Sequence, residues 1–282
     1  MPLPPDSHSH QAAAGSNAPA PQSRETELGA RDPGAEAVGR QQAVRPVAVS
    51  VVVPTFREAL NLPILVPEIC AALDGADLPH EVIVVDDDSN DGTVEAVAAL
   101  ARTLPVRLVV RRGERGLSSA VVRGFRESRG RVLVCMDADG SHPPSALPAL
   151  VRPVLDGEAD FAVGSRYVVG GSTDESWSAM RRLNSRVATM MAWSLTRLRD
   201  PMSGFFAMPK SLFDRIGSFQ PTGFKIGLEL VVRSGSSRCV EVPIHFRDRQ
   251  RGTSKLGMRQ QAEYLIQVVT LHGLKRRARQ FD

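Results

Sequence analysis

The sequence predicts an α/β fold with a mainly parallel central sheet, and three observations support this prediction. Apolar runs rich in β-branched residues recur along the chain, as in VAVSVVVP, EVIVV, VRLVV and VLVC, and they are typical of strands buried on both faces. Segments with helical spacing separate these runs, and such alternation implies right-handed βαβ crossovers. Acidic loops follow several of the runs, at the strand ends where parallel sheets bind their ligands.

The expected elements follow in order from residue 46. The first strand is VAVSVVVP, and a helix over ALNLPILVPEICAAL comes next. The strand EVIVV precedes a helix over TVEAVAALARTL, the strand VRLVVRR precedes a helix over SSAVVRGFRESRG, and VLVC ends the series. Beyond DFAVGSRY the alternation stops, and SWSAMRRLNSRVATMMAWSLTRL predicts one or two helices. We expect this second half to add an acceptor site to a nucleotide-binding half.

Composition divides the chain into three parts. Residues 1–45 are rich in Pro, Ala, Gly, Ser and Gln without a sustained apolar period, which predicts a disordered tail. Residues 46–274 form one catalytic domain that ends in an amphipathic helix, and residues 275–282 form a basic tail. A chain of 282 residues with 42% hydrophobic content is long enough to bury a sizeable core.

Charge and cysteine content narrow the class of protein. The net charge is +4, the pI is near 9.3, and the basic excess gathers near the C-terminus, which favours an anionic partner. No aromatic residues interleave with the basic ones, so nucleic-acid binding is disfavoured. Three scattered cysteines indicate neither a disulfide framework nor a zinc site and fit a reducing cytosol. The sequence shows no secretory signal and no run of about 18 apolar residues.

The segment MDADGSHPP, residues 136–144, places Asp137 and Asp139 two positions apart directly after the apolar run VLVC. Two carboxylates on one turn can hold a Mg²⁺ or Mn²⁺ ion whose remaining ligands are phosphate oxygens. Such an ion stabilises a departing diphosphate. A surface turn with two aspartates is the alternative interpretation, and the position at a strand end favours the metal.

A second acidic loop, VDDDSNDGT, follows the run VIVV. Adjacent carboxylates repel one another, so donors or a cation must compensate them. The residues Asp86, Asp87, Asp88 and Asp91 therefore serve either a ligand or the N-terminus of the following helix. Both roles are compatible, because one carboxylate can accept a hydrogen bond from a base while a neighbour caps the helix.

Seven segments resemble, in order, the dolichol-phosphate mannose synthases of inverting glycosyltransferase family 2. They are PTFREALNL, VDDDSNDGT, RGLSSAVVRGF, MDADGSHPP, GSRYVVGG, DPMSGFFA and FRDRQRGTSKLG, and the match runs from about Val47 to about Leu274. The resemblance implies a Rossmann-like GT-A fold, a GDP-mannose donor, Mg²⁺ or Mn²⁺ as cofactor, and a polyprenyl monophosphate acceptor.

The resemblance also implies roles for individual residues. Those implied to line the guanosine pocket are Pro54, Phe56, Glu58, Val85 and Asp87. Those implied to form the diphosphate and metal loop are Asp137, Ala138 and Asp139, with the metal on the two aspartates. Those implied to meet donor or acceptor phosphates are Arg166, Lys225, Arg249 and Lys255. Asp139, Arg166 and Arg249 are the candidate catalytic residues.

This chain departs from the family pattern at three places. Phe56 and Arg57 stand where the family has Tyr and Asn, which removes a hydroxyl and adds a positive charge at the pocket rim. Gly140 and Ser141 stand where the family has Leu and a metal-binding Gln, so metal preference stays open. Ser118 replaces a glycine.

The acceptor implied by the resemblance carries a long hydrocarbon, so we expect the protein to work peripherally at the cytoplasmic face of a membrane. In QAEYLIQVVTLHGL the residues Tyr264, Leu265, Val268, Val269 and Leu271 predict a broad apolar helical face, which a basic run follows. That pattern is typical of a helix lying on an anionic bilayer, and equally of a helix packed on the core. A membrane-anchoring partner protein is a further expectation.

Two alternatives to mannosyl transfer stay open. One is the same fold with another donor such as UDP-glucose, or with a non-lipid acceptor, because residue spacing does not define the hexose pocket. The other is a non-catalytic nucleotide-binding subunit, for which the loss of the family's glutamine at Ser141 is the only motive.

Overall fold

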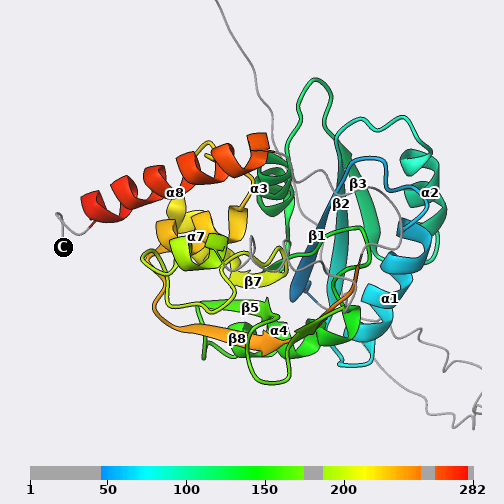
Figure 1. Cartoon of the computed structure of the whole chain (residues 1–282). Helices are drawn as coiled ribbons and strands as arrows, with labels where there is room; N and C mark the ends of the chain where they lie inside the picture. Colours follow the sequence, from blue (N-terminus) through cyan, green and yellow to red (C-terminus); the bar gives the residue numbers. More distant parts are fainter. Residues whose placement is uncertain (1–45, 175–186, 249–257, 279–282) are drawn as a thin grey trace, which may run out of the picture. The chain divides into compact units, whose positions relative to one another are not determined.

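The structure is a computed structural model that describes residues 46–174, 187–248 and 258–278 (Figure 1). The tail expected over residues 1–45 lies outside these ranges, as does much of the segment expected to form one or two helices. The described part of that segment is helical over residues 187–192.

A seven-stranded sheet forms the centre of the described structure, in the order β3-β2-β1-β4-β7-β5-β8. Only β7 pairs antiparallel with its neighbours, so the prediction of a mainly parallel sheet is confirmed. The strands are β1 (Val49–Thr55), β2 (His80–Asp86), β3 (Val106–Val110), β4 (Val132–Cys135), β5 (Phe161–Ser165), β7 (Phe206–Pro209) and β8 (Cys239–Pro243). A small parallel pair, β6 (Ser172–Thr173) and β9 (His245–Phe246), lies apart from this sheet.

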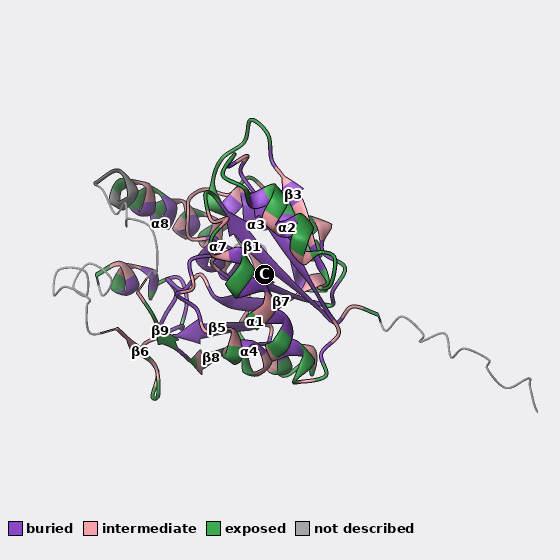
Figure 2. Cartoon of the chain, turned by 90° about the vertical axis from the view of Figure 1, so that its right-hand side faces the viewer, coloured by how far each residue is buried: buried purple, intermediate pink, exposed green. Residues whose placement is uncertain are grey.

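Helices cover both faces of the sheet, which explains why its strands are apolar throughout. Along β1, Val51 and Val53 join one core with α1 and α4, whereas Val52 points to a second core with α3, α6 and α7. Figure 2 shows the strands as buried between the helices. The helices are α1 (Leu62–Asp74), α2 (Thr93–Leu100), α3 (Leu117–Glu127), α4 (Leu147–Leu155), α6 (Lys210–Ile216), α7 (Ile226–Ser234) and α8 (Met258–Ala278), and a 3-10 turn, η1 (Pro144–Ala146), precedes α4.

Helix α2 is shorter than its sequence pattern suggested. The spacing favoured a helix to residue 104, but α2 ends at Leu100 and hydrogen-bonded turns follow it. Leu104 precedes Pro105, and the proline ring disfavours helical backbone at the residue before it. The helix therefore ends early so that the chain can enter β3 in extended form.

Helix α8 differs from the expected C-terminal helix in two respects. It continues to Ala278, so the basic tail expected from residue 275 begins inside the helix. The expected single apolar face is divided, because Tyr264, Val268 and Leu271 are buried whereas Leu265 and Val269 are exposed. The inward side chains pack in a third core with residues of α7 and of the segment 187–195. No helix within the described ranges has the length and hydropathy needed to cross a bilayer.

The parallel register brings the acidic loops to one edge of the sheet. Pro54 lies beside Val85 at the ends of β1 and β2, and β4 pairs with β1 on its other side. The loops that begin at Phe56, Asp87 and Met136 therefore leave neighbouring strands at the same edge.

Candidate active site

One exposed aromatic ring, that of Phe56, directly follows the end of β1. Pro54 and Val85 are buried, so only their edges can border a ligand, whereas Phe56 is 38% exposed. The guanidinium carbons of Arg115 and Arg57 lie 4.5 and 5.2 Å from the centre of the Phe56 ring, at cation–π distance. Phe56 is thus a partly exposed ring at the end of β1, with two guanidinium groups over it.

Glu58 and Arg57 fix the turn that follows this ring. Glu58 accepts a hydrogen bond of 2.6 Å from the amide of Asn61, just before α1. Arg57 has left-handed backbone (φ 63°), and its N–H donates to the Ser89 hydroxyl over 2.9 Å. The turn after β1 is therefore tied to the acidic loop after β2.

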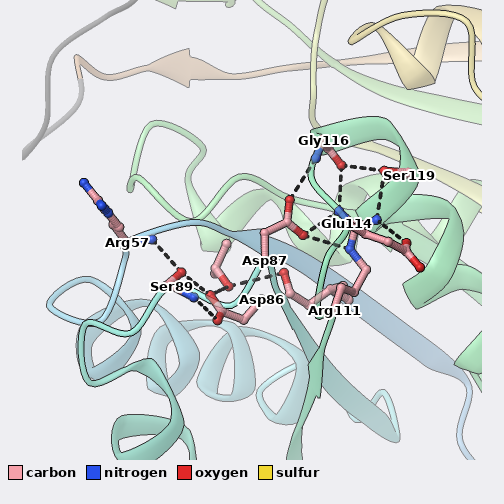
Figure 3. A network of polar contacts seen from close by, with 10 residues as sticks. Arg57, Asp86, Asp87, Ser89, Arg111, Glu114, Gly116 and Ser119 are labelled. Carbon is pink, nitrogen blue, oxygen red and sulfur yellow. Dashed lines mark hydrogen bonds and ion pairs between the residues drawn. The ribbon is translucent and has the colours of Figure 1, made fainter.

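In the first acidic loop, Asp86 is used to fold the loop itself (Figure 3). Its carboxylate accepts hydrogen bonds from the backbone N–H of Ser89 over 2.9 Å and from the Thr55 hydroxyl over 3.1 Å. The side chain is 1% exposed. Asp86 therefore contributes structure at this edge of the sheet.

Asp87, implied by the resemblance to face the base, is held by a buried ion pair. Its carboxylate accepts from Arg111 Nε over 2.8 Å, from Arg111 Nη2, and from the N–H of Gly116 over 2.8 Å (Figure 3). Arg111 also donates to the Gly116 carbonyl, to Ser119 and to Glu114. The ion pair thereby anchors the loop that carries Arg115, whose guanidinium contacts Phe56.

The sequence analysis missed Arg111. Its only signal is its position, because it directly follows β3 and its charge has no partner nearby in the sequence except Glu114. A buried arginine at a strand end beside an acidic loop requires a carboxylate, and the parallel register of β2 and β3 supplies Asp87.

The second acidic loop has a different character. The Asp137 side chain is 30% exposed, and it lies against Gly204, whose hydrogen leaves room where a Cβ would stand 3.0 Å from the carboxylate. Asp139 accepts a hydrogen bond of 3.1 Å from the N–H of Ser141. The Ala138 side chain belongs to the core, so its backbone is the part that can meet a ligand. This turn places two carboxylates, two positions apart in the chain, after the end of β4.

The buried His142 contacts the backbone of this turn. Its ring stacks on Phe205 at 5.2 Å and meets Phe246 edge-on at 5.4 Å, and its Nδ1 accepts from the N–H of Asp137 over 3.3 Å. Burial lowers the pKa of His142, against the opposing effect of Asp137 and Asp139. The neutral ring therefore acts as a fixed hydrogen-bond acceptor.

Ser141, which stands in place of the family's glutamine, is completely buried. Its hydroxyl finds no hydrogen-bond partner among the described residues. Within those residues, no group of three or more His, Cys, Asp or Glu side chains is arranged to hold a metal ion. The carboxylates of Asp137 and Asp139 nevertheless fit a hard cation, since Mg²⁺ takes one or two protein carboxylates and completes its shell with phosphate and water oxygens.

Arg166 lies at the same edge and is fixed by a carboxylate that the sequence analysis did not identify. Arg166 Nε and Nη2 each donate to Asp200 over 2.7 Å, and the Arg166 backbone N–H donates to the same side chain over 3.0 Å. Burial lowers the pKa of the Arg166 guanidinium, but its hydrogen bonds to Asp200 outweigh this effect and raise the pKa above its usual value. Asp200 lies within DPMSGFFA, a segment noted only for its resemblance.

Lys225 lies at the start of α7, and its ammonium donates to the carbonyl of Met202 over 3.0 Å. Met202 belongs to the loop 200–204, which also contains Asp200 and Gly204. That loop therefore connects Lys225, Arg166 and Asp137. The two remaining predicted phosphate contacts, Arg249 and Lys255, lie outside the residues that the structure describes.

A sheet edge with an exposed ring, a two-carboxylate turn and fixed cations is typical of enzymes that bind phosphorylated ligands. The model of Glycosyl transferase family 2 matches residues 50–217. The chain therefore belongs to glycosyl transferase family 2, and it is a glycosyltransferase.

Curated relatives extend the match beyond that range. The chain is 48% identical to a dolichol-phosphate mannosyltransferase of Mycosarcoma maydis, over 79% of this chain and 78% of the relative. It is 43% identical to a protein of the same name from Pyrococcus furiosus, over 79% of this chain and 63% of that one. It is 41% identical to the Saccharomyces cerevisiae enzyme of that name, over 81% and 88%.

Solved structures confirm the GT-A fold. A glucosyl-3-phosphoglycerate synthase from Mycobacterium tuberculosis, crystallised with Mn²⁺, UDP and glucosyl-3-phosphoglycerate, superposes with a TM-score of 0.59 at 22% identity. The match covers 80% of this chain and 79% of that one. At this identity the likeness concerns the fold.

Proposed function

We propose that this protein transfers mannose from GDP-mannose to a polyprenyl monophosphate, with inversion at the anomeric carbon. The observation that carries the proposal is the identity of 41–48% to three proteins named dolichol-phosphate mannosyltransferase. The geometry at the sheet edge supports it, because a base-sized apolar surface, two carboxylates and several cations occur together there.

The donor would lie across the ends of β1, β2 and β4. The base would stack on Phe56, between the edges of Pro54 and Val85, with Glu58 facing its polar atoms and Asp87 anchoring the loop that carries Arg115. The diphosphate then reaches the turn formed by Asp137, Ala138 and Asp139. The donor interactions thus follow the order of the strands across the sheet.

Asp137 and Asp139 would hold a Mg²⁺ or Mn²⁺ ion. The ion would offset the negative charge that develops on the departing GDP. The Ser141 N–H holds the Asp139 carboxylate, and the His142 ring holds the backbone N–H of Asp137. The backbone of the turn and one of its carboxylates are therefore held by the protein itself.

The acceptor phosphate is already anionic near pH 7, so its oxygen needs no general base. The difficulty is to bring two anions together, and fixed cations accomplish this by offsetting the repulsion and orienting the attacking oxygen. Arg166, Lys225, Arg249 and Lys255 are the proposed cations. Asp200 holds Arg166 in one orientation, so this guanidinium loses little freedom when a phosphate arrives.

The hydrocarbon tail of the acceptor requires contact with a bilayer, and exposed apolar residues indicate the surface that makes it. They lie on the outer side of α8 and on the segment 187–193, and they are Leu265, Ile266, Val269, Val187, Met190 and Trp193. The two segments contact each other, because the Tyr264 hydroxyl donates to the Ala188 carbonyl over 2.6 Å. Lys275 and Arg276 of the same helix add the positive charge that favours an anionic membrane.

The test of the reaction is transfer of labelled sugar from GDP-mannose, GDP-glucose, UDP-glucose and UDP-galactose to polyprenyl phosphate in detergent, with Mg²⁺, Mn²⁺ or chelator. Chelator-sensitive labelling from GDP-mannose alone is the expected result. Labelling from a UDP-sugar would replace the donor in the proposal, and no labelling from any donor would overturn transfer to this lipid.

The test of the membrane surface is sedimentation with anionic vesicles. The double variant Leu265→Gln, Val269→Gln should bind at least about tenfold more weakly, because it removes two exposed apolar side chains from the contact. Val94→Gln is the matched control, since Val94 is a comparably exposed apolar residue on α2. Equal vesicle binding by all three proteins would exclude this surface.

A further inference from the structure

Helix α8 carries a buried polar residue that the proposed reaction has not used. Gln267 is 0% exposed, although its neighbours on the outer side of the helix are apolar and exposed. Its Oε1 accepts from the backbone N–H of Lys225 over 3.2 Å, and its Nε2 donates to the Lys225 carbonyl over 3.3 Å. One side chain thus binds both backbone groups of a single residue, and that residue is a proposed phosphate contact.

The loop before α7 packs closely against the Gln267 side chain. A Cβ at Gly223 would lie 2.5 Å from Gln267 Oε1, so a glycine is required there for the amide to fit. The buried Glu229 lies at hydrogen-bond range of Gln267 Nε2, at 3.4 Å, and accepts from the N–H and the hydroxyl of Thr222 over 2.9 and 3.1 Å. A buried amide that loses its partners is costly, so this arrangement holds the loop in one position.

The other end of Lys225 reaches the site. Its ammonium donates to the carbonyl of Met202 over 3.0 Å, in the loop 200–204 whose Asp200 binds Arg166. Gly204 of the same loop packs against Asp137. A continuous set of contacts therefore leads from α8 through Lys225 to the loop that borders the cations and the acidic turn.

We propose that Gln267 is a positioning residue that holds Lys225 for the phosphate of the lipid acceptor, and that α8 thereby links seating on the bilayer to acceptor binding. Helix α8 presents Leu265, Ile266 and Val269 outward and Gln267 inward, within less than two helical turns. Any shift of the helix on the membrane changes the backbone position of Lys225. This inference rests on the proposed function, because it assigns Lys225 to the polyprenyl phosphate.

The test is a double-mutant cycle with Gln267→Met and Lys225→Ala. Methionine keeps the length and volume of the side chain but removes both hydrogen bonds to the Lys225 backbone. We expect Gln267→Met to raise KM for polyprenyl phosphate about tenfold while KM for GDP-mannose changes less than twofold. In the Lys225→Ala background the same substitution should change neither KM, because the lysine through which it acts is absent.

Two further variants separate positioning from folding. Gly223→Ala places a Cβ against the Gln267 side chain and leaves the sequence of α8 unchanged, and it should raise KM for the acceptor in the same way. Thr270→Ala is the matched control, because the Thr270 hydroxyl binds only the Ile266 carbonyl of its own helix, and it should leave both KM values unchanged. The melting temperature of each variant identifies any that is unfolded, in which case Gly223→Ala replaces Gln267→Met in the cycle.

The outcomes also distinguish this inference from the function on which it rests. Wild-type protein that neither transfers mannose to polyprenyl phosphate nor binds a fluorescent polyprenyl phosphate overturns both. Wild-type activity with additive effects of Gln267→Met and Lys225→Ala overturns the positioning role alone, as does an equal rise of both KM values. A tenfold rise confined to the acceptor, and abolished without Lys225, supports it.

Discussion

The two acidic loops look alike in the sequence, yet the protein uses them differently. Both follow buried strands of the same sheet and leave it at the same edge. In the loop after β2, Asp86 and Asp87 are nearly inaccessible and are bound by side chains and backbone of the protein itself. In the loop after β4, the Asp137 side chain is 30% exposed, and the buried Asp139 accepts a hydrogen bond from the Ser141 N–H within the same turn.

The difference shows that similar acidic motifs at strand ends can have different roles. Whether an aspartate builds the site or binds a ligand depends on which donors the neighbouring strands bring to it. Strand β3 delivers Arg111 to the first loop. For the second loop, Gly204 packs against Asp137 and brings no side-chain donor to it.

The largest expected effect is loss of activity in the second loop. Asp139→Asn keeps an oxygen that can accept from the Ser141 N–H but removes the negative charge that would bind the metal. We expect transfer from GDP-mannose to fall about a thousandfold or more, with the melting temperature within two degrees, roughly, of the wild type. Steady-state transfer assays and thermal unfolding measure the two effects.

The matched control is the same substitution in the first loop, at Asp88. That residue has left-handed backbone (φ 54°), which asparagine tolerates well, and no role in binding is assigned to it. Asp88→Asn should keep activity within about twofold. If Asp139→Asn retained activity like this control, the second loop would not be the metal loop.

The next effect concerns stability and belongs to the first loop. Arg111→Met leaves the Asp87 carboxylate buried without its ion-pair partner, and we expect it to lower the free energy of unfolding by about 3–5 kcal/mol. Denaturant titration measures this change. Combining Arg111→Met with Asp87→Asn should recover part of the loss, because the uncompensated charge disappears. Full stability of Arg111→Met alone would show that Asp87 does not depend on this partner.

Periodicity in the sequence was sufficient to predict the alternating strands and helices of the first half of the chain. Strands such as β1 are buried on both faces, so their apolar character is continuous and easy to recognise. The elements of the second half were harder to predict from the sequence, because β7 runs antiparallel between β4 and β5 and interrupts the βαβ pattern. No local signal marks a strand that arrives from a distant part of the chain.

Only those residues of the candidate site that belong to a recognisable sequence motif could be predicted. Asp137 and Asp139 are two positions apart in the sequence and follow a recognisable strand, so their place was predictable. Arg111 and Asp200 act through partners 24 and 34 residues away, and only the folded register brings these pairs together. Similarly, α8 was predicted as a helix, but its division into an inner and an outer face depends on what packs against it.

A smaller effect is expected on metal binding by the second loop. Ser141→Gln restores the amide that the family carries, and the longer side chain must leave the buried position of the serine hydroxyl. We expect Mn²⁺ affinity in the presence of GDP to rise about tenfold, as one added ligand would produce. Isothermal titration measures it, and Ser145→Gln, at an exposed position of η1, is the control. Unchanged affinity would mean that position 141 contributes nothing to metal binding.

The smallest effect returns to the first loop and to Asp91, which joins the acidic loop to the turn after β1. Its carboxylate accepts from the Ala59 N–H over 3.1 Å and from the N–H and hydroxyl of Thr93 over 3.2 and 2.7 Å. Partial burial raises the pKa of Asp91, but these hydrogen bonds outweigh it and lower the pKa below its usual value. Ionised Asp91 therefore stabilises the folded protein, and Asp91→Asn should cost about 1 kcal/mol at pH 7.

The pH dependence of this cost identifies its origin. Because the pKa is lower in the folded state, the stabilisation is fully present above the pKa of the unfolded chain, about 3.9, and is lost as the pH falls through the folded value. The difference in unfolding free energy between wild type and Asp91→Asn should thus shrink below about pH 4. A difference that stayed constant there would mean that the shape of the side chain, rather than its charge, holds the two loops together, and the contrast between the acidic loops would then rest on Asp86 and Asp87 alone.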